Sequence, residues 1–148
     1  MRNLSELGII PYPGTIPENP ASKQAIVDFE AKFHAKLPDA YRDMLQQFNG
    51  GVPKLKYFHT KSGRRWVVND FFSLSTNRSA TLGLWKRMEQ LRSFLGDGVI
   101  PIAGDGLGNY IVIDTRVCPP SVAIASHDPS SWIAVADSFN EFIDSLHV

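Results

Sequence analysis

Residues 100–114 read I-P-I-A-G-D-G-L-G-N-Y-I-V-I-D, and this segment is the most informative part of the chain. Two apolar runs, 100–103 and 110–113, flank a segment in which glycines alternate with other residues. Apolar runs of this length, bounded by glycine and asparagine, are typical of buried strands joined by a tight turn. The segment therefore predicts two strands of one sheet. We expect four residues to shape the turn between them: Asp105, Gly106, Gly108 and Asn109.

A glycine-rich turn also raises the possibility of nucleotide binding. Phosphate-binding loops lie between a strand and a helix N-terminus, whose free N–H groups contact the phosphate. Here a strand beginning at Tyr110 follows the glycines, and the chain contains no Gly-Lys-Ser or Gly-Lys-Thr sequence. A calcium loop needs alternating acids and a closing glutamate, which are absent around Asp105. We therefore interpret the segment as a turn that requires positive φ, without a cofactor.

The rest of the chain predicts helices and strands in separate runs. Helical periodicity occurs in four segments: residues 22–36, 38–48, 81–95 and 138–146. Strand-like runs occupy six more: residues 54–58, 65–72, 99–103, 110–114, 122–126 and 132–136. The resulting order is α-α-β-β-α-β-β-β-β-α. Such segregated runs predict an α+β fold in which helices pack on a mixed or mostly antiparallel central sheet.

The N-terminal segment and the domain that follows differ in composition. Residues 1–20 contain four prolines, which fix φ and remove N–H donors, so we expect a proline-rich arm. Residues 21–148 are long enough to form a single domain with its own core. Within it, the second helix is predicted to stop where a left-handed residue is needed. The residues at that stop are Asn49, Gly50 and Gly51.

Composition narrows the functional classes. The chain has 148 residues, 43% of them apolar, with no net charge and one cysteine, Cys118. A single cysteine excludes an intrachain disulfide and is typical of a reducing compartment. The N-terminus lacks a signal-peptide core, and no apolar run approaches the length of a membrane helix. We therefore expect a cytoplasmic protein, as a monomer or a weak homodimer.

Charge is distributed unevenly along the sequence. Residues 54–92 carry nine Lys or Arg and two acids, whereas residues 93–148 carry one Arg and seven acids. If folding keeps these charges apart, they steer the approach of a partner.

The candidates for catalysis and metal binding are weak. Cys118 precedes two prolines and lies off any predicted helix N-terminus, and Arg116 is the one cation close to it in the sequence, so little in the pattern marks it as a nucleophile. His127 is the histidine that would act with it. The four histidines and Cys118 do not show zinc-ligand spacing, because the adjacent His127-Asp128 cannot form a site alone. We predict neither an enzyme nor a metal site.

Basic and aromatic residues alternate between residues 54 and 66. The basic ones are Lys54, Lys56, Lys61, Arg64 and Arg65, and the aromatic ones are Tyr57, Phe58 and Trp66. One interpretation is nucleic-acid binding, in which cations neutralise phosphates and rings stack on bases. The other is a hairpin with aromatics inward and lysines outward. The sequence pI of about 6.9 favours the second. The same patch also suits an acidic protein partner.

Trp132 follows a predicted turn that contains Asp128. It is either a core residue or an aromatic anchor of the kind that dominates interface energetics. For a protein-binding surface we therefore predict five residues: Arg64, Arg65, Trp66, Asp128 and Trp132.

Four segments in this order resemble the SUKH superfamily, which includes the Smi/Knr cell-wall regulators and many bacterial toxin-immunity proteins. They are Leu37 to Gly51, Ile100 to Asp114, His127-Asp128, and Ala136 to Ile143. The resemblance covers about residues 22–147 and implies an α+β fold that functions by binding another protein. It implies an immunity protein that neutralises a toxin domain by direct binding, or alternatively a regulatory scaffold. The zero net charge departs from the acidic balance expected of an inhibitor of a basic nuclease.

Overall fold

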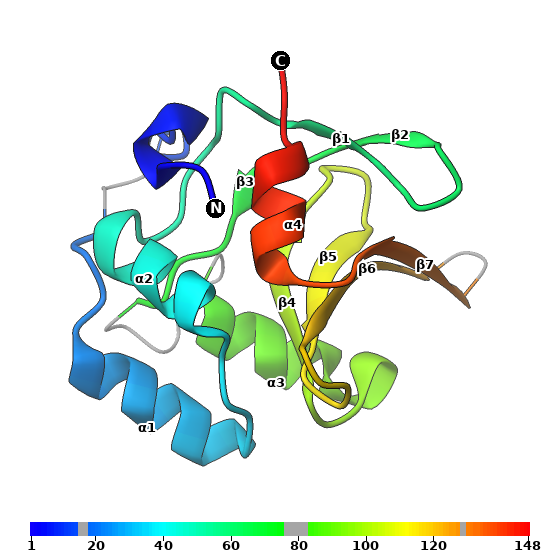
Figure 1. The fold of residues 1–148 in the computed structure, drawn as a ribbon. Helices are drawn as coiled ribbons and strands as arrows, with labels where there is room; N and C mark the ends of the chain where they lie inside the picture. The colour runs from blue at the N-terminus through cyan, green and yellow to red at the C-terminus, as the bar shows by residue number, and fades with distance from the viewer. Residues whose placement is uncertain (15–17, 76–82, 128–129) are drawn as a thin grey trace.

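The computed structural model describes residues 1–14, 18–75, 83–127 and 130–148. The helices are η1 (Leu4–Leu7, 3-10), α1 (Lys23–Phe33), α2 (Asp39–Gln47), α3 (Leu84–Leu95) and α4 (Phe139–Ser145). The strands are β1 (Tyr57–His59), β2 (Arg65–Val67), β3 (Asp70–Phe71), β4 (Val99–Gly104), β5 (Tyr110–Asp114), β6 (Ser121–His127) and β7 (Ser130–Ala136). The predicted α+β class and the order of its helices and strands are confirmed (Figure 1).

A five-stranded antiparallel sheet in the order β3-β4-β5-β6-β7 forms the centre of the domain, with helices packed against it (Figure 1). Because side chains alternate along a strand, its two faces carry different residues. One face, with Ile111 and Ile113, belongs to the main core with α2 and α4. The other, with Val112 and Ala125, packs against the last turns of α3. The two apolar runs around the glycine-rich turn thus form the central strand pair.

The hairpin of β1 and β2 forms a second, separate sheet. The sequence predicted that residues 65–72 form one strand, the second strand of this hairpin. In the structure these residues form two strands, β2 and β3, which belong to different sheets. β2 pairs with β1, whereas β3 pairs with the end of β4 in the central sheet. The division occurs at Asn69, whose N–H donates to the carbonyl of Gly104 at 2.8 Å. Val68, just before it, is fully buried and fixes the crossing point.

The N-terminal arm packs onto the domain through η1, a helix that the sequence did not reveal. Leu4 and Leu7 of η1 are buried in the core. Further along, Ile10 pairs with Val52 through two backbone hydrogen bonds of 3.0 and 2.7 Å. This approach requires a glycine at position 51, where a Cβ would lie 2.3 Å from the carbonyl oxygen of Ile10. The glycine stop therefore serves the arm as well as the helix end.

Asn49, the first residue of that stop, joins three segments through its buried amide. Its Nδ2 donates to the carbonyls of Asn19 at 2.8 Å and Leu74 at 3.0 Å, and its Oδ1 accepts from Leu74 N–H at 2.7 Å. A buried amide is costly unless it is hydrogen-bonded in this way. Asn49 thus fixes the arm and the segment after β3 to the end of α2.

Tyr41 on α2 supplies a test of core packing. Its ring meets Phe139 edge-to-face at 5.3 Å, and burial raises the pKa of its phenol. Among the residues that the structure describes, none hydrogen-bonds to the Tyr41 hydroxyl. Tyr41→Phe should therefore keep or raise the free energy of unfolding, by up to about 1 kcal/mol in urea titration. Tyr41→Ala, the control, should lose about 4 kcal/mol. A loss above about 1 kcal/mol for Tyr41→Phe would reveal a hydrogen bond to that hydroxyl.

Candidate protein-binding surface

The hairpin is fixed to the domain through Trp66, which points inward. Its Nε1 donates to Oδ2 of Asp105 at 3.1 Å. Asp105 is 5% exposed and also accepts from the N–H groups of Leu107 at 2.8 Å and Asn109 at 3.1 Å. The Asn109 side-chain amide donates to the same carboxylate at 2.7 Å. Asp105 therefore holds both the glycine-rich turn and the hairpin. The sequence placed Asp105 in the turn but gave no sign of its bond to Trp66.

The tip of the hairpin is fixed to β7. The N–H of Lys61 donates to the carbonyl of Ala134 at 3.0 Å, and its ammonium forms an ion pair with Asp137. The hydrogen bond to Asp137 raises the pKa of Lys61 above its ordinary value. Within the tip, Thr60 Oγ1 accepts from the N–H of Arg64 at 3.1 Å. Contacts at both ends thus hold the hairpin in one position.

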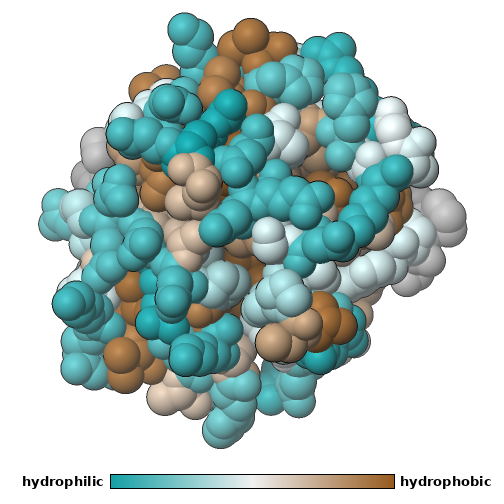
Figure 2. All heavy atoms as spheres, in the orientation of Figure 1, coloured by the Kyte–Doolittle hydropathy of each residue, from teal (hydrophilic) through white to brown (hydrophobic). Residues whose placement is uncertain are grey.

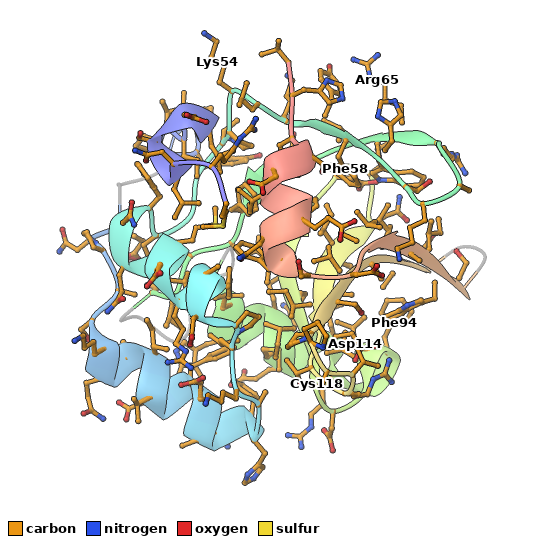
Figure 3. All side chains as sticks on the ribbon, viewed as in Figure 1. Lys54, Phe58, Arg65, Phe94, Asp114 and Cys118 are labelled. Carbon is orange, nitrogen blue, oxygen red and sulfur yellow. The ribbon has the colours of Figure 1, made fainter. Side chains whose placement is uncertain are left out.

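The outward side of the hairpin is a row of cations and rings that we call the outer hairpin face. It comprises Lys56, Tyr57, His59 and Arg65 of the hairpin, together with His147 of the C-terminal segment. The Arg65 guanidinium lies 3.9 Å and the Lys56 ammonium 5.6 Å from the Tyr57 ring centroid. His59 and His147 stack at 5.5 Å with an angle of 14° between the rings. Figure 3 shows Arg65 projecting away from the domain, with Phe58 on the opposite side of β1 toward α4.

Three of the residues predicted for binding lie on two sides of this hairpin. Arg65 pairs with His59 and points outward, whereas Trp66 pairs with the buried Phe58 and points inward. The Arg64 guanidinium lies 4.7 Å from the Trp66 ring centroid. The pattern of alternation explains this division, because neighbouring residues of a strand face opposite ways. Asp128 lies outside the described residues.

Trp132 lies on the side of the sheet that α3 covers, near its β7 edge. It pairs with Ala125, which faces the last turns of α3, but β7 itself is less covered. Trp132 is 45% exposed, and Ala134 beside it is also exposed. The Arg116 guanidinium lies 5.4 Å from the Trp132 ring centroid. We call Arg116, Trp132 and Ala134 the β7-edge surface.

Arg116 is held in place by Asp114. Its Nε donates to Oδ1 of Asp114 at 2.9 Å and its Nη2 to Oδ2 at 3.1 Å, a two-point pairing of the planar groups. The hydrogen bond from Arg116 lowers the pKa of Asp114, although burial acts in the opposite direction. The same bond raises the pKa of Arg116. In the sequence Arg116 stands out only as a neighbour of Cys118, because its contact with Trp132 depends on strand pairing.

The candidates for chemistry lie in a pocket beside α3 and in the turn that also carries Arg116. A pocket beside α3 contains Arg92 and Asp97, which pair with each other at 3.2 Å, among mainly apolar residues. Cys118 is exposed in the turn between β5 and β6. In the described part of the chain, no group of three His, Cys, Asp or Glu side chains is placed to hold a metal ion.

Together these observations define an α+β domain with a rigid hairpin attached to the edge of its antiparallel sheet. Residues 20–145 match the family model described as SMI1 / KNR4 family (SUKH-1), so the chain belongs to that family. The match confirms the predicted SUKH resemblance. No curated protein matches the chain. Within the described ranges, every helix is too short or too polar to cross a lipid bilayer.

The hydrogen bonds that the buried Asp105 accepts should contribute measurably to stability. Asp105→Ala leaves the Trp66 indole N–H and two turn amides without their buried acceptor, so it should lower the free energy of unfolding by about 3 kcal/mol. Thermal and urea unfolding measure the loss. The control is Asp97→Ala, whose side chain is 82% exposed, and it should change stability by less than about 0.5 kcal/mol. Equal effects of the two variants would contradict the role of Asp105 as an anchor.

The Asp114–Arg116 pair should make the stability of the fold depend on pH. The carboxyl of Asp114 has a lower pKa in the folded chain than the value of 3.8 that it has in the unfolded chain. Its charge therefore stabilises the fold at pH values above 3.8, and this stabilisation is lost as the pH falls through the folded-state pKa. Asp114→Asn should therefore be less stable than the unmodified chain above about pH 5, and the gap should shrink below about pH 3. Urea unfolding across this range measures it. A gap that stays constant with pH would show that the carboxylate charge contributes nothing.

Proposed function

We propose that this protein is a protein-binding module without catalytic activity that acts in the cytoplasm as an immunity protein, neutralising a toxin domain by direct binding. The observation that carries the proposal is the β7-edge surface, where Arg116 is fixed by Asp114 and its guanidinium lies over the ring of the exposed Trp132. Membership of the SMI1 / KNR4 family is consistent with an immunity or regulator type of module.

The fixed position of Arg116 favours tight binding. A flexible arginine loses side-chain entropy when a partner orders it, which subtracts from affinity. Here the two-point pairing with Asp114 orders the guanidinium before binding. Tryptophan and arginine are also the residue types most often found among those that dominate interface energies. A preordered Arg–Trp pair is therefore suited to anchor a partner.

The hairpin tip extends this surface along the same strand edge. The N–H of Lys61 donates to the carbonyl of Ala134, two residues along β7 from Trp132, so the tip lies beside the edge strand that carries Trp132. Contacts with Asp137 and Asp105 hold the hairpin to the domain. A partner can thus bind this region with little rearrangement, which supports binding through a preformed surface.

The absence of catalysis is part of the proposal, and the pocket beside α3 supports it. Catalytic acids and bases need unpaired polar groups that converge on a substrate. In that pocket the charged residues, Arg92 and Asp97, neutralise each other.

The test is rescue of cells from the toxin. A reading frame next to this gene should encode a large secreted protein with a C-terminal toxin domain, and co-expression of this chain should restore growth. Trp132→Ala should weaken binding to the purified toxin domain by about 30-fold, since anchor residues contribute about 2 kcal/mol or more. Isothermal titration calorimetry measures the affinity.

The matched control is Val27→Ala, which shortens another exposed apolar side chain, on the distant α1. Affinity should be unchanged in this variant. Failure of the unmodified chain to bind or rescue would reject the immunity role. Rescue with equal affinity for Trp132→Ala would instead reject the β7-edge surface as the binding site.

A further inference from the structure

The outer hairpin face carries positive charge that the domain itself does not neutralise. Among the described residues, none of four cations on or beside the hairpin lies within ion-pairing distance of an acid: Lys54, Lys56, Arg64 and Arg65. By contrast, Lys61 pairs with Asp137 and Arg92 with Asp97. Lys54 and Arg65 project from the same end of the molecule (Figure 3). The charges on this face are therefore free to meet a negative group from another molecule.

We propose that the outer hairpin face binds an acidic segment of a partner protein. This site is separate from the β7-edge surface and adds a second contact to the one on which the proposed function depends. Carboxylates are the groups that its arrangement fits, because the Arg65 guanidinium and the Lys56 ammonium both lie near the Tyr57 ring. Hydrophilic side chains cover most of the molecular face seen in Figure 2, with smaller hydrophobic areas between them.

The position of Arg65 supports a carboxylate ligand. Its guanidinium lies 3.9 Å from the Tyr57 ring centroid, so one flat side of the group rests on the ring. A stacked guanidinium still presents N–H donors at its edge, in the fork that matches a carboxylate at two points. The Lys56 ammonium near the same ring adds a second charge within reach. Tyr57 thus orders the cations without consuming their hydrogen-bonding capacity.

The face is also rigid enough to bind without large rearrangement. β1 pairs with β2 on one side and with His147 on the other, through two hydrogen bonds of 2.9 Å between Tyr57 and His147. On its inner side, Phe58 is fully buried and meets Phe142 edge-to-face at 5.2 Å. The strand that carries the face is therefore held from three directions.

The same geometry favours an acidic protein over a nucleic acid. Single-stranded nucleic acids bind where cations accompany open aromatic rings on which bases stack. Here Arg65 lies over the Tyr57 ring, and the His59 and His147 rings stack on each other. These rings are thus engaged by neighbouring side chains. A zero net charge adds no general attraction for polyphosphates.

Retention on immobilised poly-L-glutamate tests the proposal, with poly-L-lysine and an oligo-dT strand as comparison supports. The unmodified chain should bind poly-L-glutamate, and Lys56→Glu with Arg65→Glu should lower the affinity by at least about tenfold. The control, Lys32→Glu with Lys36→Glu, makes the same change in net charge at exposed positions on and just after α1. It should lower the affinity by less than about twofold. Circular dichroism verifies that both variants fold.

A third variant separates geometry from charge. Arg65→Lys keeps the charge but loses the two-point fork, so it should weaken binding by about threefold. Three results would each overturn the proposal. They are no retention of the unmodified chain on poly-L-glutamate, equal losses of affinity in the two double variants, and tighter binding to oligo-dT than to a poly-L-glutamate of the same total charge. These outcomes differ from failure of the toxin-binding role, which is measured by rescue and by Trp132→Ala. Retention without rescue would reject only the immunity role, and rescue without retention only the acidic-segment site.

Discussion

The buried carboxylate of Asp105 is the interaction on which both the fold and the candidate surface depend. A carboxylate at 5% exposure is costly unless it is hydrogen-bonded, and Asp105 accepts from the glycine-rich turn and from the Trp66 indole. The turn sets the register of β4 and β5, which are central to the sheet. The indole fixes the hairpin. One side chain therefore links the core of the sheet to the element that carries the exposed cations.

Rigidity of this kind changes what the surface residues contribute to binding. Arg116 is ordered by Asp114, Arg65 by Tyr57, and the hairpin tip by Asp137. Each contact is made within the domain, so a partner does not supply the free energy for ordering. The exposed groups are correspondingly few and well defined, which favours a specific partner over general adhesion.

Folding also rearranges the uneven charge of the sequence. Residues 54–92 are strongly basic and residues 93–148 strongly acidic, but Lys61 and Asp137, one from each block, pair across the hairpin tip. Part of the charge of the basic and acidic blocks is thus neutralised by an ion pair within the domain. Lys56 and Arg65 of the outer hairpin face are among the cations that form no ion pair with the described acids. Local charge of this kind steers a partner to one region.

The sequence by itself determined the α+β class, the order of the elements and the turn around Asp105. These follow from the spacing of apolar residues, from apolar runs and from the glycines that end helices and strands, all of which are local properties of the chain. The sequence also predicted a hairpin with aromatics inward and lysines outward, which holds for Phe58 and Trp66 but not for Tyr57, because neighbouring residues of a strand face opposite ways and Tyr57 lies on the outer hairpin face. Only the tertiary structure decided that residues 65–72 divide between two sheets, that η1 joins the core, and that Arg116 meets Trp132. These contacts depend on strand pairing between segments far apart in the chain, which no local pattern encodes.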